Sequence, residues 1–366
     1  MGKIFNVTAD CKPGLHYMVD ISSRLARMKG YVDRGEYFTI NRARQYGKTT
    51  TLRALKEYLK DQYYVVSMDF QVQMSYAKFR SENAFSAAFA KAFVRIIQDP
   101  DIALPEAMKT AVGNLKRATR ENREDLELVE LFQYLSDICR TADKPLVLMI
   151  DEIDSAANNR VFLDFLAQLR GHYIDRDKSP AFQSVILAGV YDIKNLKRKF
   201  RPGEDDKLNS PWNIAVDFKV GMSFTAGEIA EEVVGGEKFP ELKAAWTYAG
   251  FMEAYQILLG EKNTLFESMV NKLYDYTELR DMVCSILFTG KEYSYNALDQ
   301  AIGTAEMFGF IKNVNGTVAI ANRIFEMVFY NLFLTSAENQ NTDIYKAAIA
   351  DKNQFIYAGH LNSETC

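Results

Sequence analysis

The chain contains little cysteine and little histidine, which excludes several kinds of metal and disulfide chemistry. Its four cysteines lie far apart and form no C-x-x-C pair, so neither a zinc site nor a disulfide framework is indicated. Only three of the 366 residues are histidines, so a histidine-based metal site is not expected. This usage is typical of a reducing compartment, and we expect a cytoplasmic protein.

Long apolar runs and an excess of one charge are also missing. The longest apolar runs, such as 145–150, fall far short of the roughly 20 residues of a membrane helix, and no signal peptide is visible, so no membrane partner is expected. Lys and Arg number 44 against 48 Asp and Glu, and this balance does not indicate a nucleic-acid-binding protein. The composition, 48% apolar and 25% charged, suits about two globular domains.

Short apolar runs alternate with helical stretches over residues 1–225, which predicts an α/β fold with a parallel sheet and helices on both faces. The expected strands are 37–40, 65–70, 146–150, 184–190 and 214–220. The expected helices are 49–60, 84–97, 127–139 and 161–169. Residues 99–125 combine prolines with dense charge and are interpreted as a solvated insertion.

The pattern changes after residue 225. Glycines and a proline mark a linker over 226–250. Helices are then expected near 251–259, 264–274, 277–288, 295–308 and 322–334. Asn315-Gly316 predicts a hairpin between 311–314 and 317–320. This order predicts a winged-helix-like lid domain over 251–335, and the tail 336–366, with a helix expected at 343–351, is interpreted as the start of a missing domain.

A candidate phosphate loop lies between the first expected strand and helix. It runs Arg42-Ala43-Arg44-Gln45-Tyr46-Gly47-Lys48-Thr49-Thr50, and all nine residues are candidates for nucleotide binding. Such a loop needs backbone N–H groups in front of a helix N-terminus, a lysine for the β- and γ-phosphates and a hydroxyl for Mg²⁺. Arginine stands where the usual motif has its first glycine, so the entry to the loop must differ.

An acidic pair, Asp151-Glu152, follows the buried run 146–150. Ligands of α/β folds bind at the carboxyl ends of strands, so both acids are placed for chemistry. The first can hold Mg²⁺ and the second can deprotonate an attacking water, an arrangement that fits ATP hydrolysis. The acidic strand is expected next to the phosphate-loop strand. Asp154 is interpreted as a helix cap, with a role beside the metal as the alternative.

These residues carry a family resemblance. The segments YFTINRARQYGKTTTL, VLMIDEIDSA, SVILAGVYDIKNLK and SPWNIAVDF resemble bacterial AAA-like P-loop ATPases with an arginine-rich, RPRRFGKT-type phosphate loop, over about residues 5–335. The resemblance implies a P-loop ATPase domain over 1–225 with Walker A and Walker B motifs. It implies that Lys48 and Thr49 bind phosphate and Mg²⁺, that Asp151 binds Mg²⁺ and that Glu152 is the catalytic base beside Lys48. Many relatives continue into a restriction-nuclease-like domain, of which this sequence shows no Asp…Glu-x-Lys motif.

Several other residues are candidates for the site, and each also has a purely structural interpretation. Tyr191, Asp192 and Asn195 could sense the γ-phosphate, or Asp192 could only cap a helix. Four arginines could act as fingers on a neighbour's nucleotide, although a surface role is the simpler interpretation: Arg170, Arg176, Arg198 and Arg201. His16 and Tyr17 could approach the adenine or simply pack. Arg44 could clamp phosphate or pair with Asp151.

The function predicted from these motifs is Mg²⁺-dependent ATP hydrolysis that drives a conformational switch in a partner or effector domain. The alternatives are an ATP-binding regulator with little turnover and a nuclease-associated or DNA-binding regulator. A protein partner or self-association through the two domains is expected. DNA is not expected on the lid, because residues 250–335 hold six Lys and Arg against ten Asp and Glu.

Overall fold

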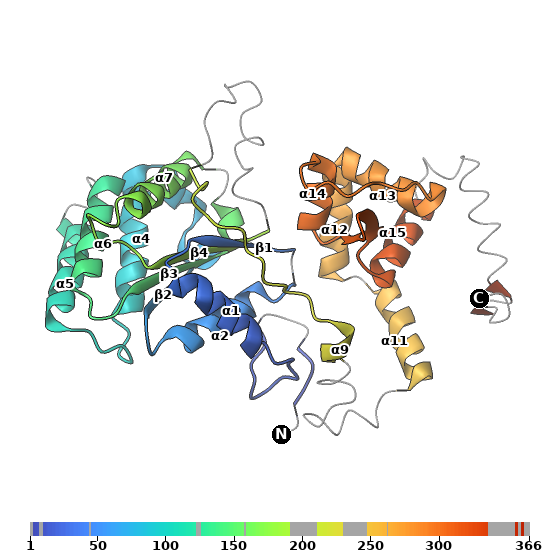
Figure 1. The fold of residues 1–366 in the computed structure, drawn as a ribbon, viewed down its shortest axis with the longest axis horizontal. Helices are drawn as coiled ribbons and strands as arrows, with labels where there is room; N and C mark the ends of the chain where they lie inside the picture. The colour runs from blue at the N-terminus through green and yellow to red at the C-terminus, as the bar shows by residue number, and fades with distance from the viewer. Residues whose placement is uncertain are drawn as a thin grey trace. The chain divides into compact units, whose positions relative to one another are not determined.

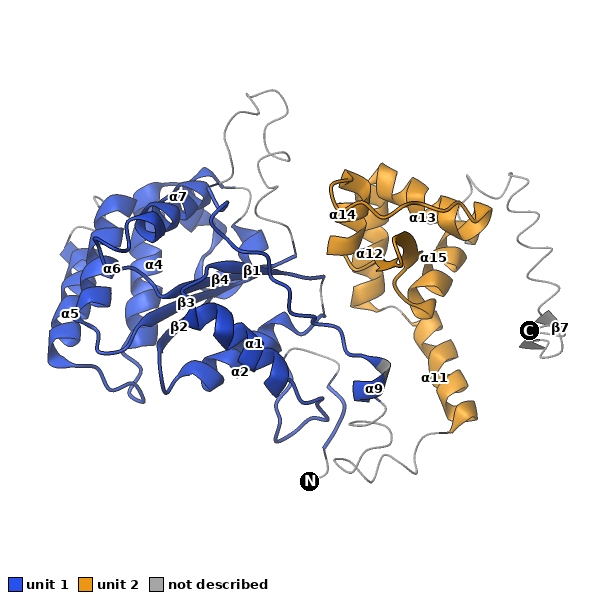
Figure 2. Cartoon of the chain, in the orientation of Figure 1, with its two compact units in different colours: residues 1–245 blue, residues 246–366 orange. Residues whose placement is uncertain are grey.

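The computed structural model describes residues 3–6, 10–43, 45–121, 126–156, 159–190, 211–229, 247–261, 263–335, 356–357 and 360–361. The chain divides into two compact units, Met1–Ala245 and Trp246–Cys366 (Figure 2). Among the described residues, no helix combines the length and the apolarity needed to cross a membrane.

The first unit is built on a four-stranded parallel sheet. The strands are β1 (Phe38–Asn41), β2 (Tyr64–Asp69), β3 (Leu146–Asp151) and β4 (Ser184–Gly189). The longer helices are α1 (Ser22–Asp33), α2 (Lys48–Leu59), α4 (Glu82–Ile97), α5 (Glu106–Glu121), α6 (Leu128–Thr141) and α7 (Arg160–Ile174). The short ones are α3 (Phe70–Gln73), η1 (Tyr76–Phe79), η2 (Ile153–Ser155) and α9 (Ala226–Ile229).

The order of the strands is β1-β4-β3-β2, which corrects one prediction. The acidic strand β3 is not adjacent to β1, because β4 lies between them. Ile186 of β4 pairs with Phe38 on one side and with Met149 on the other. Local sequence patterns identify buried strands but carry no information on their lateral order, which depends on the long-range crossovers.

Helices cover both faces of this sheet (Figure 1). In β3, Val147 and Met149 join a core with α1 and α2, whereas Leu148 and Ile150 join a second core with helices α4 to α7. This alternation follows the period of two in a strand and explains why the run is apolar at every position. All six residues of β3 are buried, including Asp151 at its end.

The expected insertion 99–125 is instead largely helix α5, packed into the core. Met108, Val112 and Leu115 recur at helical spacing and are fully buried, and α5 contacts α4 and α6. Of the charged residues that the structure describes here, Arg117, Arg120 and Glu121 are exposed on the other side of the helix, as in an amphipathic helix. The prolines precede the helix, where they cause no break. The prediction was wrong because charge density was given more weight than periodicity.

The expected strand 214–220 forms only an isolated bridge to β1. Val216 pairs with Phe38, and its N–H donates to the carbonyl of Tyr37 at 2.9 Å. Nearby, the indole N–H of the buried Trp212 donates to the hydroxyl of Thr39 at 2.8 Å. The segment therefore lies along the outer edge of β1 without forming a regular strand.

The second unit is helical with one hairpin. Its helices are α11 (Tyr248–Gly260), α12 (Thr264–Asp275), α13 (Thr277–Thr289), α14 (Gln300–Met307) and α15 (Arg323–Thr335). Its strands are β5 (Ile311–Val314), β6 (Thr317–Ile320), β7 (Ile356–Tyr357) and β8 (His360–Leu361). The succession α12-α13-α14-β5-β6 is winged-helix-like. The helix expected at 343–351 lies outside the described residues.

Local signals place the hairpin and the start of α14. Asn315 and Gly316 both have positive φ, 52° and 87°, between the paired residues Val314 and Thr317, which confirms the predicted turn. Helix α14 begins at residue 300 rather than 295, because the carboxylate of Asp299 accepts the N–H of Ile302 at 3.0 Å and caps the helix there.

Candidate active site

The loop between β1 and α2 takes its sharp backbone turns at Gln45 and Gly47. Both have positive φ, 61° and 72°, and Gly47 is the N-cap of α2. Arg42 does not have positive φ; its N–H donates to the carbonyl of Gly189 at 3.1 Å, beside the end of β4. The arginine at the place of the first glycine is therefore accommodated, since the left-handed conformations lie further along the loop.

Lys48 lies within this loop. Its Nζ donates to the carbonyls of Arg42 at 2.9 Å and Ala43 at 3.0 Å, and the residue is only 7% exposed. The first half of the loop thus curves around the ammonium group. The same ammonium lies at the N-terminus of α2, where the backbone already favours an anion.

Thr49 and Asp151 meet across 102 residues of sequence. The Thr49 hydroxyl donates to Oδ2 of Asp151 at 2.7 Å, and Oδ1 of the same carboxylate accepts the N–H of Glu152 at 2.9 Å. Asp151 is 5% exposed, so both of its oxygens are engaged in a nearly dry environment. The structure therefore brings the two sequence motifs into direct contact.

Glu152 is held in a conformation that is unusual for a residue with a side chain. Its φ of 53° and ψ of 41° are left-handed, and it precedes η2. Burial raises the pKa of its carboxyl, and the neighbouring Asp151 raises it further, whereas Lys48 acts in the opposite direction. A half-buried carboxylate with a raised pKa at the end of a strand is typical of a functional group.

Asp154 ties the end of β4 to this acidic turn. Its Oδ2 accepts the N–H of Val190 at 2.7 Å. It lies inside η2, and the N-cap of α7 is Asn159, which corrects the interpretation of Asp154 as a helix cap. A Cβ at Gly189 would lie 2.7 Å from Ile153 Cγ1 and 2.9 Å from Asp154 Oδ1. Only glycine allows β4 to approach the turn this closely.

Sequence reasoning missed Asp69. It ends β2 directly opposite Asp151 and caps α3 by accepting the N–H of Val72 at 3.1 Å. It also contributes to the raised pKa of Glu152. The available signal was its place after a buried run, the same position that Asp151 has after β3.

The N-terminal segment contacts the first turns of α2. The N–H of Cys11 donates to the hydroxyl of Thr50 at 3.1 Å, and Asp10 forms an ion pair with Arg53. His16 and Tyr17 are part of this segment. The imidazole Nδ1 of His16 accepts the Lys12 N–H at 2.9 Å, and the Tyr17 ring packs on Phe5 at 4.8 Å.

Of the other candidates, Tyr46 is in the loop, and burial raises the pKa of its phenol. Arg176 binds the carbonyl of Gly35 at 2.7 Å and stacks on Tyr173, at the amino end of β1 and away from the loop. Arg170 is exposed on α7. The remaining candidates lie outside the described residues: Arg44, Tyr191, Asp192, Asn195, Arg198 and Arg201.

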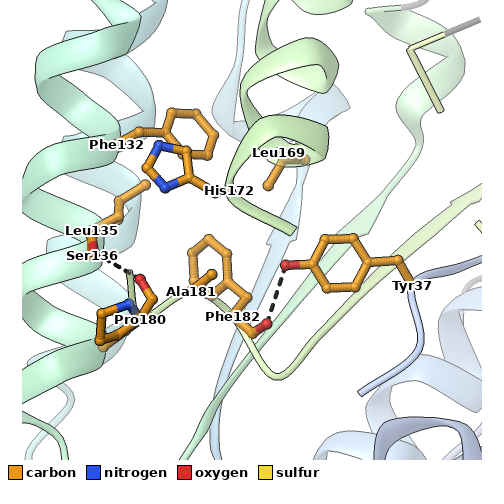
Figure 3. Close-up of a pocket in the computed structure, with 10 residues that line it drawn as sticks. Tyr37, Phe132, Leu135, Ser136, Leu169, His172, Pro180, Ala181 and Phe182 are labelled. Carbon is orange, nitrogen blue, oxygen red and sulfur yellow. Dashed lines mark hydrogen bonds between the residues drawn. The ribbon is translucent and has the colours of Figure 1, made fainter. Parts of the chain in front are cut away.

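A small cavity lies elsewhere, between α6, α7 and the segment before β4 (Figure 3). Its volume of about 10 Å³ suits one water at most. The Tyr37 hydroxyl donates to the carbonyl of Phe182 at 3.1 Å, and the Ser136 hydroxyl donates to that of Pro180 at 2.7 Å. Because these polar groups already bond within the protein, we interpret the cavity as a packing defect and not as a second active site.

Comparison with known proteins agrees with this geometry. Residues 32–176 match the family described as AAA ATPase domain. No curated protein matches the chain. A Walker-type ATPase of Pyrococcus abyssi is similar in fold, with 14% identity, a TM-score of 0.54, and 89% of this chain and 99% of the other covered.

Two further solved structures are more distant. One is Drosophila ORC bound to AT-rich DNA and Cdc6, with 11% identity, a TM-score of 0.31 and coverage of 87% and 91%. The other is ORC1 of Aeropyrum pernix in complex with DNA, with 14% identity, a TM-score of 0.28 and coverage of 91% and 94%. These likenesses are too weak to support an argument.

The sheet order, the loop before α2 and the acidic end of β3 define a P-loop nucleoside triphosphatase. Together with the matched domain, they show that the chain carries an AAA-like ATPase domain and is an ATPase by class.

The raised pKa of Glu152 leads to a prediction about stability. Well below pH 4.5 the carboxyl is protonated in the folded and unfolded states. As the pH rises, the unfolded state ionises first because its pKa is lower, and this favours unfolding. Glu152→Gln should therefore have a higher Tm than wild type at pH 7, and the difference should shrink as the pH falls towards 4. Thermal unfolding between pH 4 and 8 measures this.

The matched control is Glu253→Gln, which replaces an exposed carboxylate on α11. A Glu152→Gln protein less stable than wild type at pH 7 would show that the ionised carboxylate is stabilised by its surroundings.

Proposed function

We propose that this ATPase binds ATP with Mg²⁺ at the loop 42–50 and hydrolyses it to drive a conformational change in a partner or effector domain. The observation that carries the proposal is the 2.7 Å hydrogen bond between Thr49 and Asp151. It places a hydroxyl and a carboxylate, both oxygen ligands, at the N-terminus of a helix with a buried lysine beside them. That combination suits a nucleotide phosphate with its magnesium.

The donor set fits Mg²⁺. Hard cations prefer oxygen ligands, and Mg²⁺ in nucleotide sites is held by one or two protein groups together with substrate phosphates. Thr49 and Asp151 supply such groups. Among the described residues, no cluster of three or more His, Cys, Asp or Glu could hold a metal by itself. When bound, Mg²⁺ would neutralise charge on the β- and γ-phosphates.

The proposed roles of Lys48 and Glu152 follow from their positions and charges. Lys48 presents its ammonium in the loop and stabilises negative charge on the phosphates as the bond to the leaving ADP breaks. Glu152 accepts the proton of the water that attacks the γ-phosphorus. Its raised pKa makes its carboxylate a stronger base than an ordinary glutamate, which favours this transfer.

The switch is supported by the bonds around β4. The N–H of Val190, the residue after β4, donates to Asp154 of the acidic turn, so a rearrangement of Glu152 and its neighbours can be passed to the end of β4. A regulator with little turnover is the second candidate, favoured by the buried bonds of Lys48 within its own loop. Single-turnover hydrolysis by the purified protein distinguishes the two.

Lys48→Ala should weaken ATP binding by roughly 10- to 100-fold, because it removes a charged hydrogen-bond donor worth about 1.5–3 kcal/mol. Titration of a fluorescent ATP analogue in the presence of Mg²⁺ measures the Kd. Lys60→Ala, at the exposed end of the same helix, is the control and should bind normally. Unchanged binding by Lys48→Ala would refute the assignment of the loop.

Glu152→Gln and Asp151→Asn should separate chemistry from metal binding. Glu152→Gln retains the shape of the side chain but removes the base, so it should bind ATP and hydrolyse it roughly 10²–10⁴-fold more slowly. Asp151→Asn should instead raise the Mg²⁺ concentration needed for nucleotide binding. Steady-state turnover and Mg²⁺ titrations report these effects, and wild-type turnover in Glu152→Gln would contradict the role of the base.

The lid is proposed to contact protein rather than DNA. Helix α14 carries Glu306 and its cap Asp299 but no lysine or arginine, and the adjoining hairpin offers only Lys312. Its buried positions, Ile302 and Ala305, face the core of the unit, whereas Leu298 before the helix is 94% exposed. An acidic helix would be repelled by the phosphates of a DNA groove.

A fragment of residues 247–335 should therefore show no salt-dependent binding to duplex DNA at low ionic strength. Electrophoretic mobility shifts at two salt concentrations test this, with circular dichroism as the control that the fragment is helical. Micromolar binding that weakens steeply with salt would favour the DNA-binding function.

A further inference from the structure

Within the first unit, helix α4 borders an open groove of about 890 Å³. Four alanines of α4 line it, and we call them the alanine floor: residues 84, 87, 88 and 92. Val72 of α3 also lines it, and we call this residue the wall of the groove. Lys78, Lys91 and Arg95 also line it. We call this hollow the α4 groove.

The charge of the α4 groove is strongly one-sided. Residues 70–98 contain four Lys and Arg and one acid, Glu82. Glu82 is directed elsewhere, because its carboxylate accepts the N–H of Leu128 at 2.7 Å. In the part of the chain that the structure describes, no ion pair joins Lys78, Lys91 or Arg95 to a carboxylate. On a protein with a net charge of −4, this is a local basic site.

The same groove offers apolar surface. Val72, which lines it, is 78% exposed. The alanine floor has no long side chains, so the backbone or side chains of a ligand could approach α4 closely. Lys91 and Arg95 are four residues apart and continue the line of Ala84 and Ala88 along the helix, so cations and apolar floor form one stripe.

We propose that the α4 groove binds an acidic amphipathic segment of a partner protein. Such a segment places apolar side chains on the alanine floor and carboxylates against Lys78, Lys91 and Arg95, the helix-in-groove mode of recognition. The negative charge of such a segment complements the positive charge of the groove, which favours this kind of partner. Nucleic acid fits less well, because its backbone needs cations along the track and stacking aromatics rather than an alanine floor.

The α4 groove is directly connected to the active site. Val72 forms its wall, and the N–H of Val72 is bound by Asp69, the residue opposite Asp151. Helix α3 also packs against η2, which follows Glu152. A bound segment would therefore alter the surroundings of Glu152. This coupling rests on the proposed function, whereas binding to the groove does not.

The test uses the full chain and a fluorescein-labelled synthetic 16-residue helical peptide with leucines on one face and glutamates on the other. Fluorescence anisotropy should show saturable, salt-sensitive binding.

The double variant Lys91→Glu/Arg95→Glu should weaken peptide binding at least about tenfold, because it places negative charges of the protein next to those of the peptide. Ala88→Trp, which fills the groove without changing charge, should weaken it as well. Arg120→Glu/Lys178→Glu makes the same change in charge at exposed positions elsewhere and should bind normally.

Several results would overturn the proposal: no saturable binding by wild type, an equal loss in the Arg120→Glu/Lys178→Glu control, or a duplex DNA that binds more tightly than the peptide at the same site. A wild-type dimer in light scattering that Lys91→Glu/Arg95→Glu dissociates would assign the groove to a second copy of the chain.

The coupling is tested separately by ATP turnover with and without saturating peptide. A change in turnover of wild type, with unchanged peptide affinity in Glu152→Gln, supports it. Peptide binding by a protein without any turnover would refute the proposed hydrolysis while the groove assignment stands.

Discussion

Strand β4 is hydrogen-bonded on both sides at the point where it ends, and these bonds hold the two halves of the candidate site together. The Gly189 carbonyl accepts the N–H of Arg42 at the entry to the phosphate loop, and the next residue, Val190, donates to Asp154 behind the acidic pair. A side chain at Gly189 would collide with Ile153 and Asp154. The distance between loop and acidic turn is thus set by a single strand whose last residue must be small, and the contact of Thr49 with Asp151 depends on it.

Around Glu152, the effect of nearby carboxylates on its pKa exceeds the effect of nearby positive charge. Asp69, Asp151 and Asp154 all affect Glu152, and the effect of Lys48 does not offset theirs together with burial, so the pKa of Glu152 stays raised. Concentrating carboxylates at one edge destabilises the fold locally. Natural proteins keep such arrangements where function needs them, and a divalent cation accompanied by phosphates is the ligand class that would relieve this repulsion.

The sequence identifies the parts of this site better than their arrangement. Gly47, Lys48 and Thr49 lie between a short strand and a helix, and Asp151-Glu152 ends a buried run, because these signals are local in the chain. Contacts between residues far apart in the chain decide three other features: the position of β4 within the sheet, the packing of α5 and the single bridge at Val216. No pattern within a short window contains that information. The role of Asp154 was missed for the same reason, since its partner is 36 residues away.

The path from the surface to the carboxylate of Glu152 is short because β2 and β3 are in register. Asp69 lies opposite Asp151, so any force on α3 acts one strand away from the acidic pair Asp151-Glu152. Helix α3 has only four residues and begins at the capped end of β2, so its position depends on the bond between Asp69 and Val72. Because Val72 is exposed, a ligand in the groove can perturb its bond to Asp69. The hydrogen bonds of Asp151 are buried and are not accessible to such a ligand. The bond at the end of β2 is thus the more accessible of the two, and the buried end of β3 is the more rigid.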